Sequence, residues 1–184
     1  MARARFLIAA AVLALIAHPV VPANAAAEPS PYRLHVQGHM GFGVRAIDIE
    51  IPWDSSKNGS PFDFTADASD DIGLERLRWV WSRLQTVPEG RKVTFETDSE
   101  SIRAWREAGY LVLEPHHLDD RDDHHARIRI PDYIVNTVLD NDGRLTNRDI
   151  ERLARDRGKV TLVKISSDVG GCSVWLDSTR ERSD

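Results

Sequence analysis

Residues 126–157 read ARIRIPDYIVNTVLDNDGRLTNRDIERLARDR, which has the pattern of one strand followed by two helices. Ala126, Ile128 and Ile130 alternate with arginines, as is typical of a strand with one buried face. Pro131 ends that strand and suits the first turn of a helix, because it has no N–H to donate. The apolar spacing that follows predicts two short helices, separated by a turn at 140–143.

The second of these helices has signals at both of its ends. Thr146 and Asp149 have the spacing of a capping box, in which each side chain binds the backbone N–H of the other. Gly158 suits the position that closes a helix. Strands are then predicted at 159–165 and 172–176, and the polar loop between them ends in two glycines, as hairpin loops do.

Residues 47–113 show a similar order of elements. A strand at 47–52 has the same alternation, residues 74–84 have the apolar spacing of a helix, and strands at 92–96 and 102–106 flank a polar loop. Four short blocks of this region match later blocks in the same order. The pairs are 49–52 with 128–131, 74–77 with 150–153, 92–94 with 159–161, and 102–107 with 172–177.

These matches predict an internal repeat. The expected fold is α+β, with two similar repeat units, each a small antiparallel sheet with one or two helices packed on one face. The first strand of one unit exposes Asp48 and Glu50, and that of the other exposes Arg127 and Arg129, so we expect these strands to lie side by side. The predicted segments are a signal peptide at 1–27, units at 28–114 and 126–177, a His/Asp-rich linker at 115–125, and a charged tail at 178–184.

The segment 1–27 has the order of a secretory signal. Arg3 and Arg5 precede an apolar run at 6–17, and Ala23-Asn24-Ala25 forms a small-residue cleavage site. That run is shorter than the roughly 20 residues that a membrane-spanning helix needs. We therefore expect an exported bacterial protein, periplasmic or secreted, that has no transmembrane segment after cleavage.

Composition excludes several classes of protein. Cys172 is the only cysteine of the 184 residues, so an internal disulfide framework is excluded. The net charge of −5 argues against nucleic acid as a partner. No Gly-x-Ser-x-Gly or phosphate-binding loop occurs in the sequence, so no catalytic residue or cofactor is assigned. A hydrolase with an unassigned site stays as an alternative.

The favoured function is a non-catalytic binding or interaction module of the cell envelope or secretome. In the predicted helix at 74–84, Trp79 falls outside the apolar stripe, and Arg78 lies next to it. An exposed tryptophan beside an arginine is typical of a protein interface. We therefore predict that Trp79 and Arg78 contact an unknown protein or envelope component.

The alternative function is the binding of zinc or another divalent metal by the His/Asp-rich segment 116–125. Imidazole and carboxylate groups suit such ions, although no helical His-x-x-x-His spacing occurs here, and a solvated linker is the simpler interpretation. The candidate ligands are His116, His117, Asp119, Asp120, Asp122, Asp123, His124 and His125.

A weaker alternative is a calcium site at 140–149. Asp140, Asp142 and Asp149 resemble part of an EF-hand loop, with Gly143 at its glycine position. Val138 stands where the first carboxylate of such a loop is expected, and Asp149 replaces the bidentate glutamate. A turn followed by a helix cap explains the same residues.

Overall fold

In the computed structural model, one antiparallel sheet of eight strands contains every strand of the described residues, in the order β2-β1-β8-β7-β6-β5-β4-β3. The structure describes residues 31–40, 46–53, 71–96, 100–117, 126–168 and 170–178. The strands are β1 (Tyr32–Met40), β2 (Ile47–Pro52), β3 (Val93–Glu96), β4 (Glu100–Glu107), β5 (Tyr110–His117), β6 (Ala126–Pro131), β7 (Val160–Ser167) and β8 (Gly170–Ser178). The helices in these ranges are α2 (Asp71–Gln85), α3 (Asp132–Asp140) and α4 (Asn147–Arg157).

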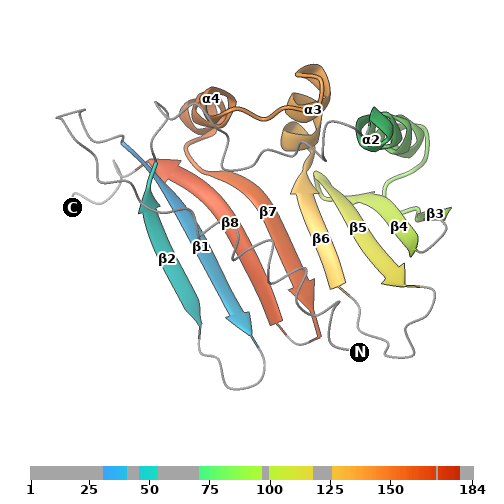
Figure 1. Cartoon of the computed structure of the whole chain (residues 1–184), viewed down its shortest axis with the longest axis horizontal. Coiled ribbons are helices and arrows are strands. Elements are labelled where there is room, and N and C mark those ends of the chain that lie inside the picture. The colour runs from blue at the N-terminus through green and yellow to red at the C-terminus, as the bar shows by residue number, and fades with distance from the viewer. Residues whose placement is uncertain are drawn as a thin grey trace.

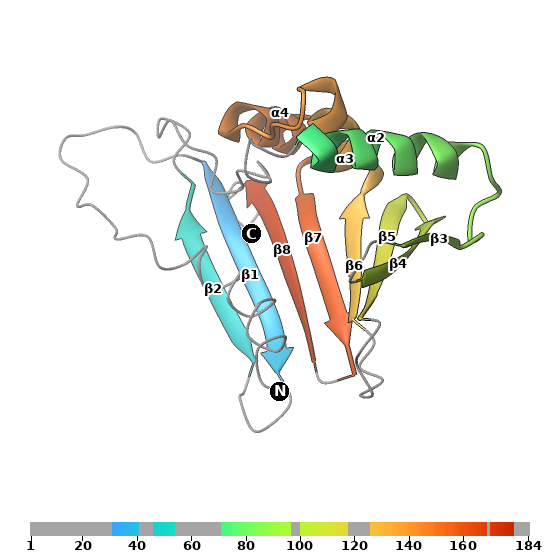
Figure 2. The same ribbon diagram turned by 45° about the vertical axis from the view of Figure 1, so that its right-hand side comes forward.

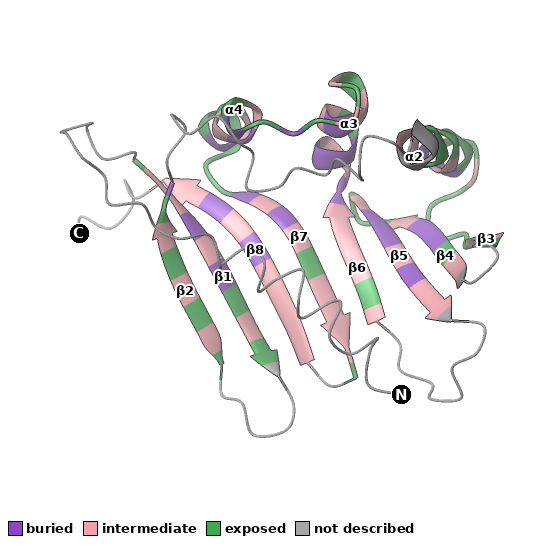
Figure 3. Ribbon diagram, in the orientation of Figure 1, coloured by how far each residue is buried: buried purple, intermediate pink, exposed green. Residues whose placement is uncertain are grey.

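The helices gather near one end of the strands (Figures 1 and 2). Their apolar faces cover the adjoining part of one sheet face, and the buried residues concentrate there (Figure 3). One group of buried side chains includes Leu34, Val174 and Leu176 of the sheet with Ile134 and Ile150 of α3 and α4. A second group lies under α2 and consists of Trp81, Leu84, Ala104, Leu111 and Val135.

Alternation along each strand defines the two faces of the sheet. In β2 the three isoleucines are half-buried, whereas Asp48, Glu50 and Pro52 between them are exposed. Successive side chains of a strand point to opposite faces. The neighbours of the core residues therefore point to the face without described helices, which we call the helix-free face.

The local predictions agree with the structure. The hairpins β3–β4 and β7–β8 form where the sequence places them. Pro131 precedes α3, and α4 begins with a capping box between Thr146 and Asp149 and ends at Gly158. Gly158 has a φ of 77°, a backbone conformation that glycine adopts readily.

The prediction of two α+β repeat units is wrong, because the strands form one continuous sheet. β6 pairs directly with β7, whereas β2 and β3, their supposed counterparts, lie at opposite edges. The matched blocks also differ in register. Val93 pairs with Ala104, but Val160 pairs with Leu176 rather than with Val174, which the repeat would place opposite it.

The predicted contact between the first strands of the two units is also wrong. β1, β8 and β7 lie between β2 and β6, so Asp48 and Glu50 do not face Arg127 and Arg129. Glu50 pairs instead with Arg33 of the neighbouring β1, at 3.0 Å. Opposite charges do meet across adjacent strands, but the repeat assigned the wrong neighbours.

Candidate functional site

The edge formed by α2 and β3 carries the exposed tryptophan. In α2, Trp81 and Leu84 point into the core, and Trp79 has 60% of its surface exposed. It is the only large hydrophobic residue among the described residues that is exposed. Its ring meets Phe95 of β3 edge-on, with the ring centres 5.3 Å apart. Trp79 therefore lies on the surface and is held in place against the edge strand.

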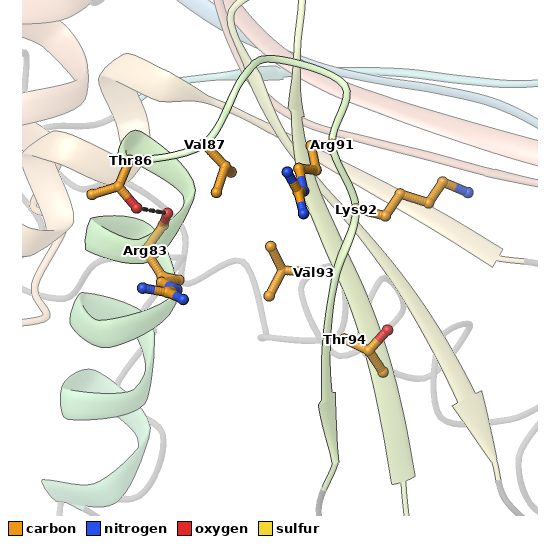
Figure 4. A pocket seen from close by; sticks show the side chains of 7 residues that line it. All are labelled: Arg83, Thr86, Val87, Arg91, Lys92, Val93 and Thr94. Carbon is orange, nitrogen blue, oxygen red and sulfur yellow. Dashed lines mark hydrogen bonds between the residues drawn. The ribbon is translucent and has the colours of Figure 1, made fainter.

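An open hollow of about 530 Å³ lies between the end of α2 and β3. We call it the α2–β3 groove. In Figure 4, Val87, Arg91 and Val93 face the space beside the helix, whereas Lys92 extends to the other side. Val87 and Val93 also pack against the core group under α2, so the groove has an apolar base. Its lining residues are Arg83, Thr86, Val87, Arg91, Lys92, Val93 and Thr94.

Arg78 has a different role from its neighbour Trp79. Its guanidinium binds Glu75 of the same helix at 2.8 Å and Asp142 of the α3–α4 turn at 2.7 Å. Both carboxylates raise the pKa of Arg78. These bonds connect α2 to the α3–α4 turn, so the structure brings Arg78 to a contact within the chain.

A buried carboxylate lies on the helix-free face near the same edge. The side chain of Glu114 in β5 is only 4% exposed. It accepts hydrogen bonds from Nε of Arg127 and from Nε2 of His116, both at 3.1 Å. Lys92 and Arg103 place their charged nitrogens 3.8 Å from its oxygens. Burial by itself would raise the pKa of Glu114, but Arg127, Lys92 and His116 outweigh it, and the pKa lies below its ordinary value.

The cations around Glu114 also cover a buried tryptophan. Lys92 lies 4.5 Å and Arg127 5.9 Å from the ring centre of Trp105, which is 5% exposed. Such contacts between a cation and a ring stabilise the arrangement. Since three cations surround one carboxylate, this part of the helix-free face carries an excess of positive charge.

A second aromatic group lies on the helix-free face around β8. Trp175 stacks on His35 with ring centres 5.0 Å apart, and Lys159 lies 4.2 Å from the centre of the tryptophan ring. Asp177 binds Nε2 of His35 at 2.9 Å and accepts a hydrogen bond from the Trp175 indole at 3.2 Å. These contacts join β1 to β8, and Asp177 is a common acceptor for Nε2 of His35 and for the indole N–H of Trp175.

Most of the predicted divalent-metal ligands lie outside the described residues. His116 and His117 belong to β5 rather than to a loop, and His116 is bound to Glu114. Within the described ranges, no group of three or more histidines, cysteines and carboxylates is placed to hold a metal ion. The candidates outside these ranges are Asp119, Asp120, Asp122, Asp123, His124 and His125.

The three aspartates of the calcium hypothesis have separate positions. Asp140 is exposed at the end of α3, and Asp142 binds Arg78 of α2. Asp149 caps α4 through Thr146 and binds Arg152 at 2.9 Å. Burial would raise the pKa of Asp149, but the bonds from Thr146 outweigh it and the pKa is lowered. The turn and helix cap predicted as the simpler interpretation are present.

Sequence reasoning missed Glu114, Arg83 and Arg91. Glu114 follows three apolar residues in a strand, and a single acid in such a run is a detectable signal of a buried carboxylate. Its partners are His116 of the same strand, Arg103 and Arg127 of the two neighbouring strands, and Lys92 just before β3, so their convergence depends on the sheet order. Arg83 lies four residues after Trp79, and this spacing places both on one side of a helix.

Comparisons with protein-family models, with curated proteins and with solved structures found no match. No helix among the described residues has the length and apolar character required to cross a membrane.

Proposed function

We propose that the protein is an exported, non-catalytic binding module whose α2–β3 edge contacts a partner. The partner is a protein or another component of the cell envelope. The exposed Trp79 carries the proposal, because a large ring left in water beside a groove is typical of an interface anchor. The signal-like order of residues 1–27 supports export.

The surroundings of Trp79 support a binding surface. Phe95 holds its ring by an edge contact, so little side-chain freedom is lost when a partner packs on it. Arg83 continues the same side of α2 toward the groove, which adds charge for orientation. The only thiol does not favour a nucleophilic role, since burial raises the pKa of Cys172.

Replacement of Trp79 tests this proposal. We expect Trp79→Ala to weaken partner binding by about 30-fold, which corresponds to the roughly 2 kcal/mol of an interface anchor. Its stability should change by less than about 1 kcal/mol, because the ring is mostly exposed. The measurement is quantitative capture of components from the envelope fraction of the source organism, with the melting temperature of each variant.

Gln85→Ala is the matched control, since Gln85 is another exposed residue of α2 that lies on a different side of the helix. This variant should capture the same component as the wild type. Equal capture by Trp79→Ala and the wild type would contradict the proposal. An equal loss of capture in Gln85→Ala and Trp79→Ala would contradict it as well.

A further inference from the structure

The outer side of β3 offers backbone groups for pairing. Among the described residues, β3 pairs with β4 alone and forms the last strand of the sheet. In an antiparallel pair, every second residue points its N–H and C=O away from the partner strand. Such an edge can accept a further strand from another chain.

A strand added to β3 would have two different surroundings. Side chains on the helix side would lie next to Val87 and Val93. They would also lie next to Phe95, whose ring contacts that of Trp79. Side chains on the helix-free side would lie next to Lys92. The helix side combines an apolar base, Val87 and Val93, with the arginines of the groove, and the helix-free side of the strand carries Lys92 and Glu96 at its two ends. A segment that places apolar residues against this base and acidic residues near Arg91 and Lys92 therefore fits the edge.

The charges around the edge favour an acidic segment. The guanidinium groups of Arg83 and Arg91 are exposed, and neither forms an ion pair within the described part of the chain. Two carboxylates lie in the same region. Glu89 already accepts the N–H of Ala108, and Glu96 lies at the opposite end of β3 from Lys92. Acidic residues of an added strand therefore belong at the Arg91–Lys92 end.

We propose that the partner binds through an extended segment of alternating apolar and acidic residues, which pairs with the outer edge of β3 as an added strand beside α2. This inference rests on the proposed binding function and specifies the partner chemistry. A second copy of this chain fits the edge less well, because two β3 edges would bring like charges of Arg83 and Arg91 together.

A synthetic heptapeptide of alternating glutamate and valine is the probe, labelled at its N-terminus and measured by fluorescence anisotropy with the full mature protein. Peptides that carry N-methyl groups on alternate residues remove the backbone donors of one side only. Two such peptides are needed, one methylated on the odd residues and one on the even residues, and we call these the two N-methyl frames. We expect one frame to abolish binding and the other to retain it. A control peptide of alternating lysine and valine should bind at least 10-fold more weakly than the glutamate–valine peptide. Equal binding in both frames, or no binding of the unmethylated peptide, would overturn the inference.

Two protein variants test the charge argument. Arg91→Glu should weaken binding of the glutamate–valine peptide at least 10-fold, because it replaces a cation that forms no ion pair in the described ranges. Arg155→Glu makes the same charge change on the exposed side of α4 and should leave binding within about 2-fold. Equal losses of peptide binding in the two variants would contradict a local charge effect. Dimers that form with increasing protein concentration in sedimentation would show that a second copy of the chain occupies the edge, which would also overturn the inference.

The outcomes for the two proposals can be separated. If Trp79→Ala abolishes capture of the natural partner and the N-methyl frames behave alike, only strand addition fails. If Trp79→Ala captures the partner to the same extent as the wild type, the proposed function fails, and strand addition, which rests on it, fails with it.

Discussion

Glu114 shows how a single buried charge can organise a sheet surface. A carboxylate is costly to bury unless partners supply hydrogen bonds and opposite charge. Here Arg127 and His116 provide the bonds, and Lys92 and Arg103 provide further charge. His116 lies in the same strand, Arg103 and Arg127 lie in the neighbouring strands, and Lys92 directly precedes β3. Glu114 therefore holds three cations together, and two of them, Lys92 and Arg127, lie over Trp105.

We expect Glu114→Gln to lower the free energy of unfolding by about 1–3 kcal/mol, because the buried site keeps its cations and loses the compensating charge. Glu107→Gln is the control, since Glu107 is half exposed and pairs with Arg129 at 3.4 Å. That variant should lose less than about 1 kcal/mol. Urea denaturation at neutral pH measures both, and similar losses in the two variants would show that Glu114 has no special role.

The lowered pKa of Glu114 also predicts that the stability lost in Glu114→Gln depends on pH. The pKa of Glu114 is lowered in the folded protein, so ionised Glu114 favours folding above the pKa of an unfolded glutamate, which is about 4.3. This contribution is lost as the pH falls through the lower folded value. The stability difference between wild type and Glu114→Gln should therefore be largest near neutral pH and shrink below about pH 4. A constant difference would contradict the charged state assigned to Glu114.

At the scale of elements, local chemistry determines where the helices and hairpins begin and end. Thr146 and Asp149 form the capping box of α4 that their spacing predicts, and Gly158 closes the helix. These features were predictable because the interacting residues lie within a few positions of one another. The exposed position of Trp79 follows in the same way from the apolar stripe of α2.

Replacement of the capping residue tests the energetic value of this signal. Thr146→Ala should lower the free energy of unfolding by about 1 kcal/mol, because the N-terminal N–H groups of α4 lose an acceptor. Thr86→Ala is the control, since its hydroxyl only donates to an exposed carbonyl at the end of α2. Thermal or urea unfolding measures both. A larger loss for Thr86→Ala would contradict the capping account.

At the scale of the whole molecule, the order of the strands was not predictable from the repeat. Short matches arise easily between segments that share the same strand, helix and hairpin pattern, since they need only the same alternation of residues. Strand order depends on pairings between distant residues, such as β1 with β8, and no local signal reports them. The convergence on Glu114 and the place of β3 at the edge of the described sheet follow from that order, so they could not be derived from the sequence.

The sheet has two edges among the described strands, and they differ in what surrounds them. β3 lies beside α2, Trp79 and the unpaired arginines of the α2–β3 groove, whereas β2 exposes Asp48 and Glu50. An acidic segment is therefore attracted to one edge and repelled by the other. This difference makes β2 an internal control for any test of strand addition.

Amide hydrogen exchange of the protein, with and without a saturating glutamate–valine heptapeptide, tests the central claim most directly. Backbone pairing slows the exchange of the amides that it engages. We predict slower exchange at Val93–Glu96 and unchanged exchange at Ile47–Pro52. Slower exchange at β2, or unchanged exchange at both edges, would contradict the assignment of the α2–β3 edge as the partner-binding surface.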